Sequence, residues 1–169
     1  MDLVSIVNRR KGELNKEMLL GLLSEWTVEV RQLKDMRVKE LYKMYLEYFD
    51  NLDFSLFSFD RKYIWYSFED LITYNFRKEM LLSSFERPFV IVRDVLWELL
   101  VFKSDLECTC CGNDNFRIMV NEIRTAVFGV CDVCGCSKLL YGKADSIEAQ
   151  LYPATQNIVE TYGFTPSAY

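Results

Sequence analysis

Residues 108–112 read CTCCG and residues 131–136 read CDVCGC, and the two stretches hold all six cysteines of the chain. Each stretch contains the pattern C-x-x-C-G. Two intervening residues allow a tight turn to direct both sulfurs and several backbone N–H groups toward one metal ion. The glycine that follows accepts the positive φ that such a turn imposes. The pattern therefore predicts two metal-binding turns.

Cys108, Cys111, Cys131 and Cys134 are the predicted metal ligands. The segment between the two pairs, residues 112–130, has a length typical of four-cysteine zinc sites. Four thiolates bind Zn²⁺ in tetrahedral geometry, with zinc–sulfur distances of about 2.3 Å. Iron accepts the same four thiolates, so the spacing leaves iron open as an alternative while we expect zinc. A zinc ion with four protein ligands has no position left for water or substrate, which predicts a structural role.

Cys110 and Cys136 remain outside these pairs. Either one can replace a neighbouring cysteine as a ligand, and Cys136 can also be a small packing residue or a reactive thiol. A single C-x-x-C pair also suits a redox dithiol, although two glycine-flanked pairs do not require that interpretation. Disulfides are not expected, because we expect a reducing compartment.

The residues around the cysteines favour a small antiparallel sheet. Residues 116–120 are rich in strand-forming side chains, residues 125–128 return toward the second cysteine pair, and residues 137–141 supply a third strand before Gly142. With these strands, residues 107–142 resemble the zinc-ribbon group of folds. The resemblance implies metal binding, but ribbons serve transcription, translation, enzymes and protein contacts alike. It does not extend to the rest of the chain.

The first part of the chain has the pattern of a helical bundle. Apolar residues recur at helical spacing in four segments, which are residues 2–10, 15–51, 60–80 and 88–102. Asp60 is a candidate N-cap for the third segment, and Pro88 suits the first turn of the last. Residues 27–30 alternate and could form a strand, but we favour helix.

These patterns predict an α+β protein with three parts. Residues 1–105 are a helical domain, residues 106–144 a zinc-ribbon module, and residues 145–169 a C-terminal helix and tail. In the last part we expect Pro153 to open a helix over residues 154–162, with Gly163 as its C-cap and Ile158, Val159 and Tyr162 as its apolar stripe.

Charge and composition exclude several classes of function. The chain has 20 basic and 25 acidic residues, a net charge of −5 and no histidine. Nucleic-acid binders show a basic face, so we do not expect a nucleic-acid partner. Without histidine, Ser-His-Asp and Cys-His catalytic systems are excluded. Acidic pairs such as Asp94 and Glu98 are ordinary solvated helix charges, and we do not expect an enzyme.

We therefore expect a non-enzymatic protein-binding module with a structural zinc ion. A sharper form of this hypothesis is an acidic inhibitor or immunity protein that neutralises a basic toxin or nuclease, since opposite charge speeds capture. The alternative is a nucleic-acid or transcription-associated zinc-ribbon factor. The first ten residues lack the charge and apolar order of a secretory signal, and no segment is apolar enough for a membrane span, so we expect a cytoplasmic protein.

Overall fold

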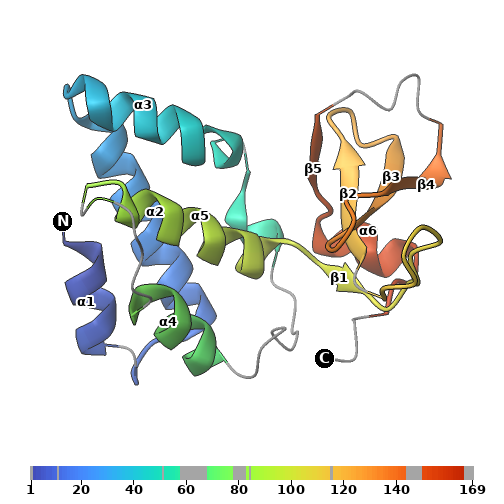
Figure 1. Ribbon diagram of the computed structural model, residues 1–169, viewed down its shortest axis with the longest axis horizontal. Helices are drawn as coiled ribbons and strands as arrows, with labels where there is room; N and C mark the ends of the chain where they lie inside the picture. Colours follow the sequence, from blue (N-terminus) through green and yellow to red (C-terminus); the bar gives the residue numbers. More distant parts are fainter. Residues whose placement is uncertain are drawn as a thin grey trace. The chain divides into compact units, whose positions relative to one another are not determined.

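The chain divides into a helical part and a part built on an antiparallel sheet (Figure 1). The computed structural model describes residues 2–10, 12–50, 52–57, 68–77, 83, 85–114, 116–143 and 150–165. The first unit, here the helical unit, comprises Met1–Phe54 with Lys62–Leu99, and the second, the sheet unit, comprises Ser55–Arg61 with Leu100–Tyr169. Helices come first, then an antiparallel sheet and a short helix, so the predicted α+β class is confirmed.

The helical unit follows the predicted segments. Its elements are α1 (Leu3–Arg10), α2 (Lys16–Gln32), α3 (Met36–Tyr45), η1 (Glu47–Phe49), α4 (Phe68–Arg77) and α5 (Arg87–Leu100), and the 3-10 turn η2 (Phe54–Leu56) follows η1. Residues 27–30 lie inside α2, so the helical interpretation of that stretch is confirmed. Pro88 lies in the first turn of α5, as predicted. Asp60, the predicted cap before α4, lies outside the described residues.

The periodic segment from residue 15 to residue 51 is divided by a cap. Asn15 begins α2 by accepting a hydrogen bond from the backbone N–H of Met18. Asp35 begins α3 in the same way, accepting from the N–H groups of Arg37 and Val38. An acidic side chain that satisfies two free N–H groups stabilises a new helix start, so α2 and α3 are separate helices. Their buried residues, together with those of α1, α4 and α5, form the core of the helical unit.

The sheet unit is built around strand β2. Its strands are β1 (Lys103–Ser104), β2 (Phe116–Asn121), β3 (Ala126–Cys131), β4 (Ser137–Gly142) and β5 (Leu151–Pro153), all antiparallel to their neighbours. The order is β1-β2-β3-β4, and β5 pairs with β2 beyond the short β1. The three strands predicted between residues 116 and 142 are confirmed. Strands β1 and β5 were not predicted.

The C-terminal segment departs from the prediction at Pro153. We expected this proline to open a helix over residues 154–162, but it ends β5 opposite Met119, and α6 spans Gln156–Thr161. Proline lacks a backbone N–H, and a position at a sheet edge tolerates that loss as well as a first helical turn does. The C-cap of α6 is Tyr162 and not Gly163 as predicted; Gly163 follows it with φ +65°, the left-handed conformation in which a glycine commonly ends a helix.

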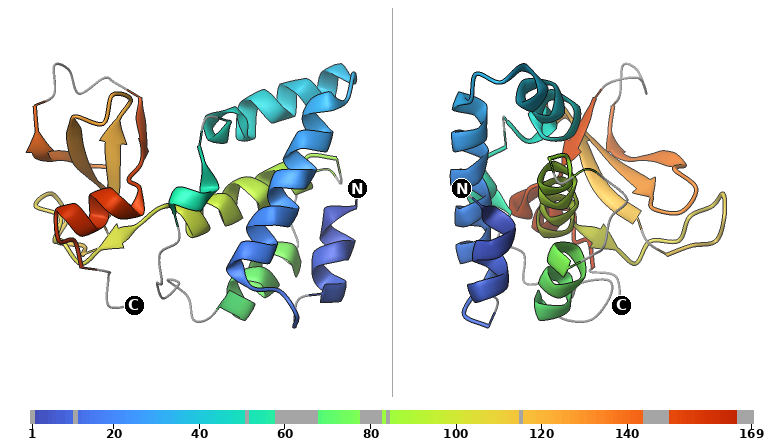
Figure 2. Two further views of the ribbon diagram at one scale, coloured as in Figure 1. Left: turned by 180° about the vertical axis from the view of Figure 1, so that it is seen from behind. Right: turned by 60° about the vertical axis from the view of Figure 1, so that its left-hand side comes forward.

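The predicted apolar stripe of this helix is only partly buried. Val159 is buried, but Tyr162 is exposed and its ring stacks on that of Tyr141 from β4, with 4.4 Å between the ring centroids. Of the three residues predicted to form the stripe, Val159 is buried, Ile158 is half-buried and Tyr162 is exposed. In Figure 2 this helix lies beside the sheet within the same unit. None of the helices in the described parts of the chain is long and apolar enough to cross a membrane.

Candidate metal centre

The two C-x-x-C-G motifs form turns of the same geometry. In the first, residues 108–113, the N–H of Cys108 donates to the carbonyl of Asn113 (2.7 Å) and the N–H of Gly112 donates to the carbonyl of Cys108 (2.8 Å). Gly112 has φ +72°, a conformation that other residues rarely adopt, so the glycine of the motif is required here. We call residues 108–113 the first knuckle.

The second knuckle, residues 131–136, repeats this pattern position by position. The N–H of Cys131 donates to the carbonyl of Cys136 (2.9 Å), and the N–H of Gly135 donates to the carbonyl of Cys131 (3.0 Å). Gly135 has φ +70°. The pattern seen in the sequence thus corresponds to a repeated backbone structure, one turn leading toward β2 and the other following β3.

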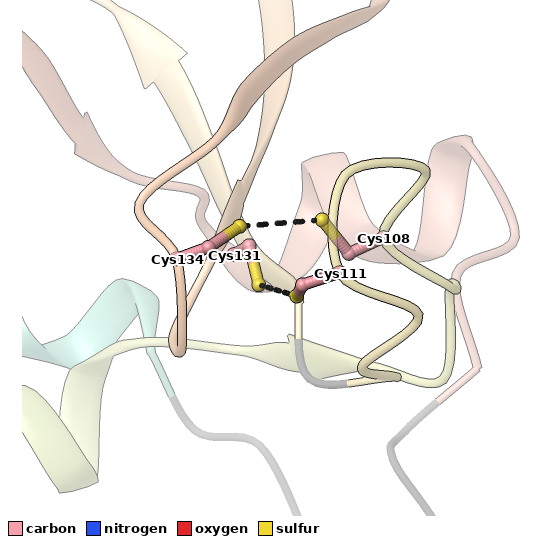
Figure 3. Close-up of side chains that lie close together, drawn as sticks. All are labelled: Cys108, Cys111, Cys131 and Cys134. Atoms are coloured by element: carbon pink, nitrogen blue, oxygen red, sulfur yellow. Dashed lines mark hydrogen bonds between the residues drawn. The ribbon is translucent and has the colours of Figure 1, made fainter.

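The two knuckles bring the sulfurs of Cys108, Cys111, Cys131 and Cys134 within 4.8 Å of one another. The Sγ atoms of Cys108 and Cys134 are 3.6 Å apart, as are those of Cys111 and Cys131, and both contacts cross from one knuckle to the other (Figure 3). Four sulfurs at about 2.3 Å from a central ion are about 3.8 Å from each other. We call these four residues the cysteine cluster, and their spacing suits a tetrahedral metal ion.

One side of the cysteine cluster is buried and the other is exposed to solvent. Cys108 and Cys131 are buried and pack with the ring of Phe116 from β2, whereas Cys111 and Cys134 are exposed. An apolar ring against two of the sulfurs excludes water from that side and would stabilise metal–sulfur bonds there. The exposed pair leaves a route by which an ion can enter.

Hydrogen bonds and neighbouring thiols shift the pKa values within the cluster in opposite directions. Backbone N–H groups of Cys134 and Val133 lower the pKa of Cys131 to about 7, against the effect of burial. At Cys111 the N–H of Asn113 lowers the pKa, but partial desolvation of the thiolate and the three neighbouring sulfurs outweigh it and raise the pKa to about 12. Crowded thiols resist ionising together unless a cation lies among them. The cluster is therefore suited to hold a divalent ion.

A group of charges that sequence reasoning missed lies beside the second knuckle. Asp132 forms one ion pair with Lys103 of β1 (Nζ–Oδ2 3.0 Å) and a second with Arg117 of β2. Lys103 and Arg117 are direct partners across the two strands, and like charges in that position repel. Asp132 removes the repulsion and attaches β1 and β2 to the second knuckle.

Neither the role of Lys103 nor that of Asp132 had a clear signal in the sequence. The side chain of Lys103 is only 9% exposed and that of Asp132 14%, although such residues are rarely buried unless paired. The excess positive charge of this group also offsets part of the −2 that four thiolates and a divalent ion carry together. Asp132 entered the sequence analysis only as a spacer between two cysteines.

The structure pairs Cys110 and Cys136 in a disulfide, which the sequence analysis did not expect. These residues come from different knuckles, 26 positions apart in the chain. Cys110, Cys136 and Cys108 also form a second group of nearby sulfurs. The expectation that the chain forms no disulfide was therefore wrong. It relied on the expected reducing compartment, which says nothing about which cysteines the fold brings together.

Comparisons of the chain with protein-family models, with curated proteins and with solved structures gave no match.

Proposed function

We propose that this protein is a non-enzymatic protein-binding module whose sheet unit is organised by a structural zinc ion. The observation that carries the proposal is the group of four sulfurs from two matched knuckles. Four cysteine ligands complete the tetrahedron that zinc prefers, so such an ion supplies folding energy and not a reaction centre. The absence of histidine from the chain is consistent with this role.

Metal analysis tests the zinc part of this proposal. Purified protein should contain one zinc ion per chain, and replacing zinc by cobalt should produce the absorption bands of a tetrahedral thiolate site. Iron would instead colour the protein red in its oxidised form and appear in elemental analysis. Protein prepared with reductant and without chelators that holds no stoichiometric metal would contradict the proposal.

The link between the metal and protein binding is the exposed apolar side chain of Val133. This residue lies between Cys131 and Cys134 and is 66% exposed. The two flanking ligands would hold its backbone rigid once the ion is bound, and rigid apolar side chains on a polar surface favour protein contacts. Ile123, in the turn between β2 and β3, is also highly exposed.

The net charge of −5 supports a basic partner. Opposite charge accelerates association and favours correct partners over wrong ones. Within this class, we propose an inhibitor or immunity protein that covers a basic toxin or nuclease. Such a role needs a rigid contact surface and no catalytic groups of its own.

A binding experiment with two matched variants tests the contact surface. Affinity purification of the metal-loaded protein at low salt should recover a basic protein, and Val133→Asp should abolish the recovery while keeping the metal. Val28→Asp is the control, because Val28 is also exposed but lies on α2 in the helical unit. Failure to recover any basic protein at low salt would contradict the proposed partner class.

The alternative function is that of a nucleic-acid or transcription-associated zinc-ribbon factor, and one observation favours it in the form of single-stranded nucleic-acid binding. Tyr141 and Tyr162 form a partly exposed stack, and aromatic rings of this kind can bind bases. Against it, Arg117 is already paired with Asp132. Fluorescence anisotropy with labelled DNA and RNA at low salt distinguishes the two functions, because nucleic-acid binding must appear there and weaken as salt rises.

A further inference from the structure

The fifth and sixth cysteines link the same two knuckles that carry the cysteine cluster. Cys110 lies in the first knuckle and Cys136 ends the second, with 6.6 Å between their Cα atoms. That separation is within the range of ordinary disulfides. Cys110 is exposed and Cys136 is partly buried, so one of the two thiols is accessible from solvent.

The backbone N–H group of each of these two residues also donates a hydrogen bond to a sulfur of the cysteine cluster. The N–H of Cys110 donates to the sulfur of Cys108 at 3.4 Å, and the N–H of Cys136 donates to the sulfur of Cys134. Those two sulfurs are themselves 3.6 Å apart. The disulfide and the contact between the sulfurs of Cys108 and Cys134 therefore both connect the first knuckle to the second, and they do so at neighbouring positions. A bond between the side chains limits the movement of both backbone donors.

We propose that Cys110 and Cys136 are a reversible redox-modification site that locks the metal into the cysteine cluster when it is oxidised. The oxidant is a low-molecular-weight disulfide of the glutathione type. The exposed Cys110 loses its proton and attacks one sulfur of the oxidant, which releases a first thiol and leaves a mixed disulfide. Cys136 then loses its proton and attacks the Cys110 sulfur, which forms the Cys110–Cys136 bond and releases a second thiol.

The electron balance of this reaction leaves the metal ligands unchanged. Two electrons pass from the two cysteine thiols to the oxidant, and the four sulfurs of the cluster stay as thiolates on the ion. The inference rests on the proposed metal site. Oxidation should make the ion leave more slowly and bind more tightly, because a cross-link between the knuckles restricts the open states through which an ion leaves.

A second metal ion is the competing use of these residues. Cys108, Cys110 and Cys136 also lie close enough for three sulfurs to share one ion. The disulfide uses two of those sulfurs, so the oxidised protein can bind one ion only. Counting metal ions in the fully reduced protein separates the two possibilities.

The test compares the wild-type protein with Cys110→Ser/Cys136→Ser, both reduced, loaded with zinc and then treated with oxidised glutathione. Native mass spectrometry should show one zinc ion in each protein before treatment. Treatment should remove two hydrogen atoms from the wild type alone, with zinc retained, and peptide mapping should place the new bond between Cys110 and Cys136. Extraction of zinc by a chelator should then be at least about tenfold slower than from the reduced wild type. The double variant should show no such change.

Other results would overturn the inference. These are loss of zinc on oxidation, a bond that includes a cluster cysteine, an unchanged extraction rate, or two zinc ions in the reduced wild type. Absence of zinc from the double variant would make Cys110 or Cys136 a ligand and also refute it. Absence of zinc from the reduced wild type itself refutes the proposed function first. The order of measurements therefore tells the two failures apart.

Discussion

The two units of this protein are stabilised in different ways. The helical unit buries large aliphatic and aromatic side chains, among them Leu19, Leu23, Ile72, Val95 and Leu99, which are 4% exposed or less. The sheet unit has its own apolar layer, but β4 is almost wholly exposed and the knuckles consist of short loops. Small sheets with few layers need additional constraints. The comparison teaches that a metal ion in the cysteine cluster would matter for the sheet unit and not for the helical unit.

Metal removal should therefore separate the units, and this is the largest effect expected. Structural zinc contributes on the order of 10 kcal/mol to folding in small domains. Chelation, or Cys131→Ser, should abolish hydrogen-exchange protection in β2, β3 and β4 while α2 and α5 keep theirs. Two of the three tryptophans, Trp26 in α2 and Trp97 in α5, belong to the described part of the helical unit, so their fluorescence should change little. A parallel loss of protection in both units would show that they do not fold independently.

The next largest effect is expected at Asp132. Asp132→Ala removes the carboxylate that pairs with the nearly buried ammonium of Lys103, and breaking a buried pair costs about 3–5 kcal/mol. Urea unfolding followed by the cobalt absorption bands should show the loss. Glu122→Ala is the control, because Glu122 is exposed in the turn after β2 and should change stability by less than about 0.5 kcal/mol. Equal effects of the two variants would remove Asp132 from the account of the site.

A cavity made in the helical unit should have the reverse effect of metal removal: the helical unit should lose stability, and the metal site should not change. Leu23 is fully buried in α2, so Leu23→Ala should lower the free energy of unfolding by about 2–5 kcal/mol. Urea unfolding followed by tryptophan fluorescence measures this loss, and the cobalt bands should not change. Val28→Ala, on the exposed side of the same helix, is the matched control. If the cobalt bands weaken in the Leu23 variant, the units are coupled.

The sequence predicted the regular parts of both units because each has a period or a fixed spacing. Helical periodicity located α1, α2, α3 and α5, and the repeated C-x-x-C-G spacing predicted which four cysteines lie together. That these cysteines bind zinc stays a prediction. The cap at Asp35 has the local chemistry of a helix start and could have been used to divide the long periodic segment.

What the sequence did not predict depends on contacts between distant residues. Strand β1 has only two residues, too few for any alternation to be visible, and it is a strand because Lys103 pairs with Arg117. Pro153 fits either a helix start or a sheet edge, and its pairing with Met119 decides between them. The Cys110–Cys136 bond likewise depends on how the two knuckles face each other.

The smallest expected effect is a difference between the units in how their stability depends on pH. In the helical unit, Arg31 donates to the hydroxyl of Tyr42 (2.8 Å), and that hydroxyl donates to Asp50. Burial, and then the bond to Asp50, raise the pKa of Tyr42 to about 12. An unfolded tyrosine ionises near pH 10. Because the folded pKa is the higher one, the contribution of Tyr42 is complete below pH 10 and is lost as the pH rises toward 12.

Tyr42→Phe should therefore flatten part of the alkaline decline in stability of the helical unit. At neutral pH the variant should lose about 1 kcal/mol, the value of one hydrogen bond, because Arg31 and Asp50 still pair directly. Part of the slope should remain, since a hydrogen bond to Glu86 also raises the pKa of Tyr45. Tryptophan-monitored urea unfolding between pH 8 and 11.5 measures both quantities. The sheet unit should behave in the opposite way and fail in acid, where protons displace the metal from its thiolates. An alkaline decline of equal slope in wild type and variant would mean that Tyr42 ionises as readily in the fold as in the open chain.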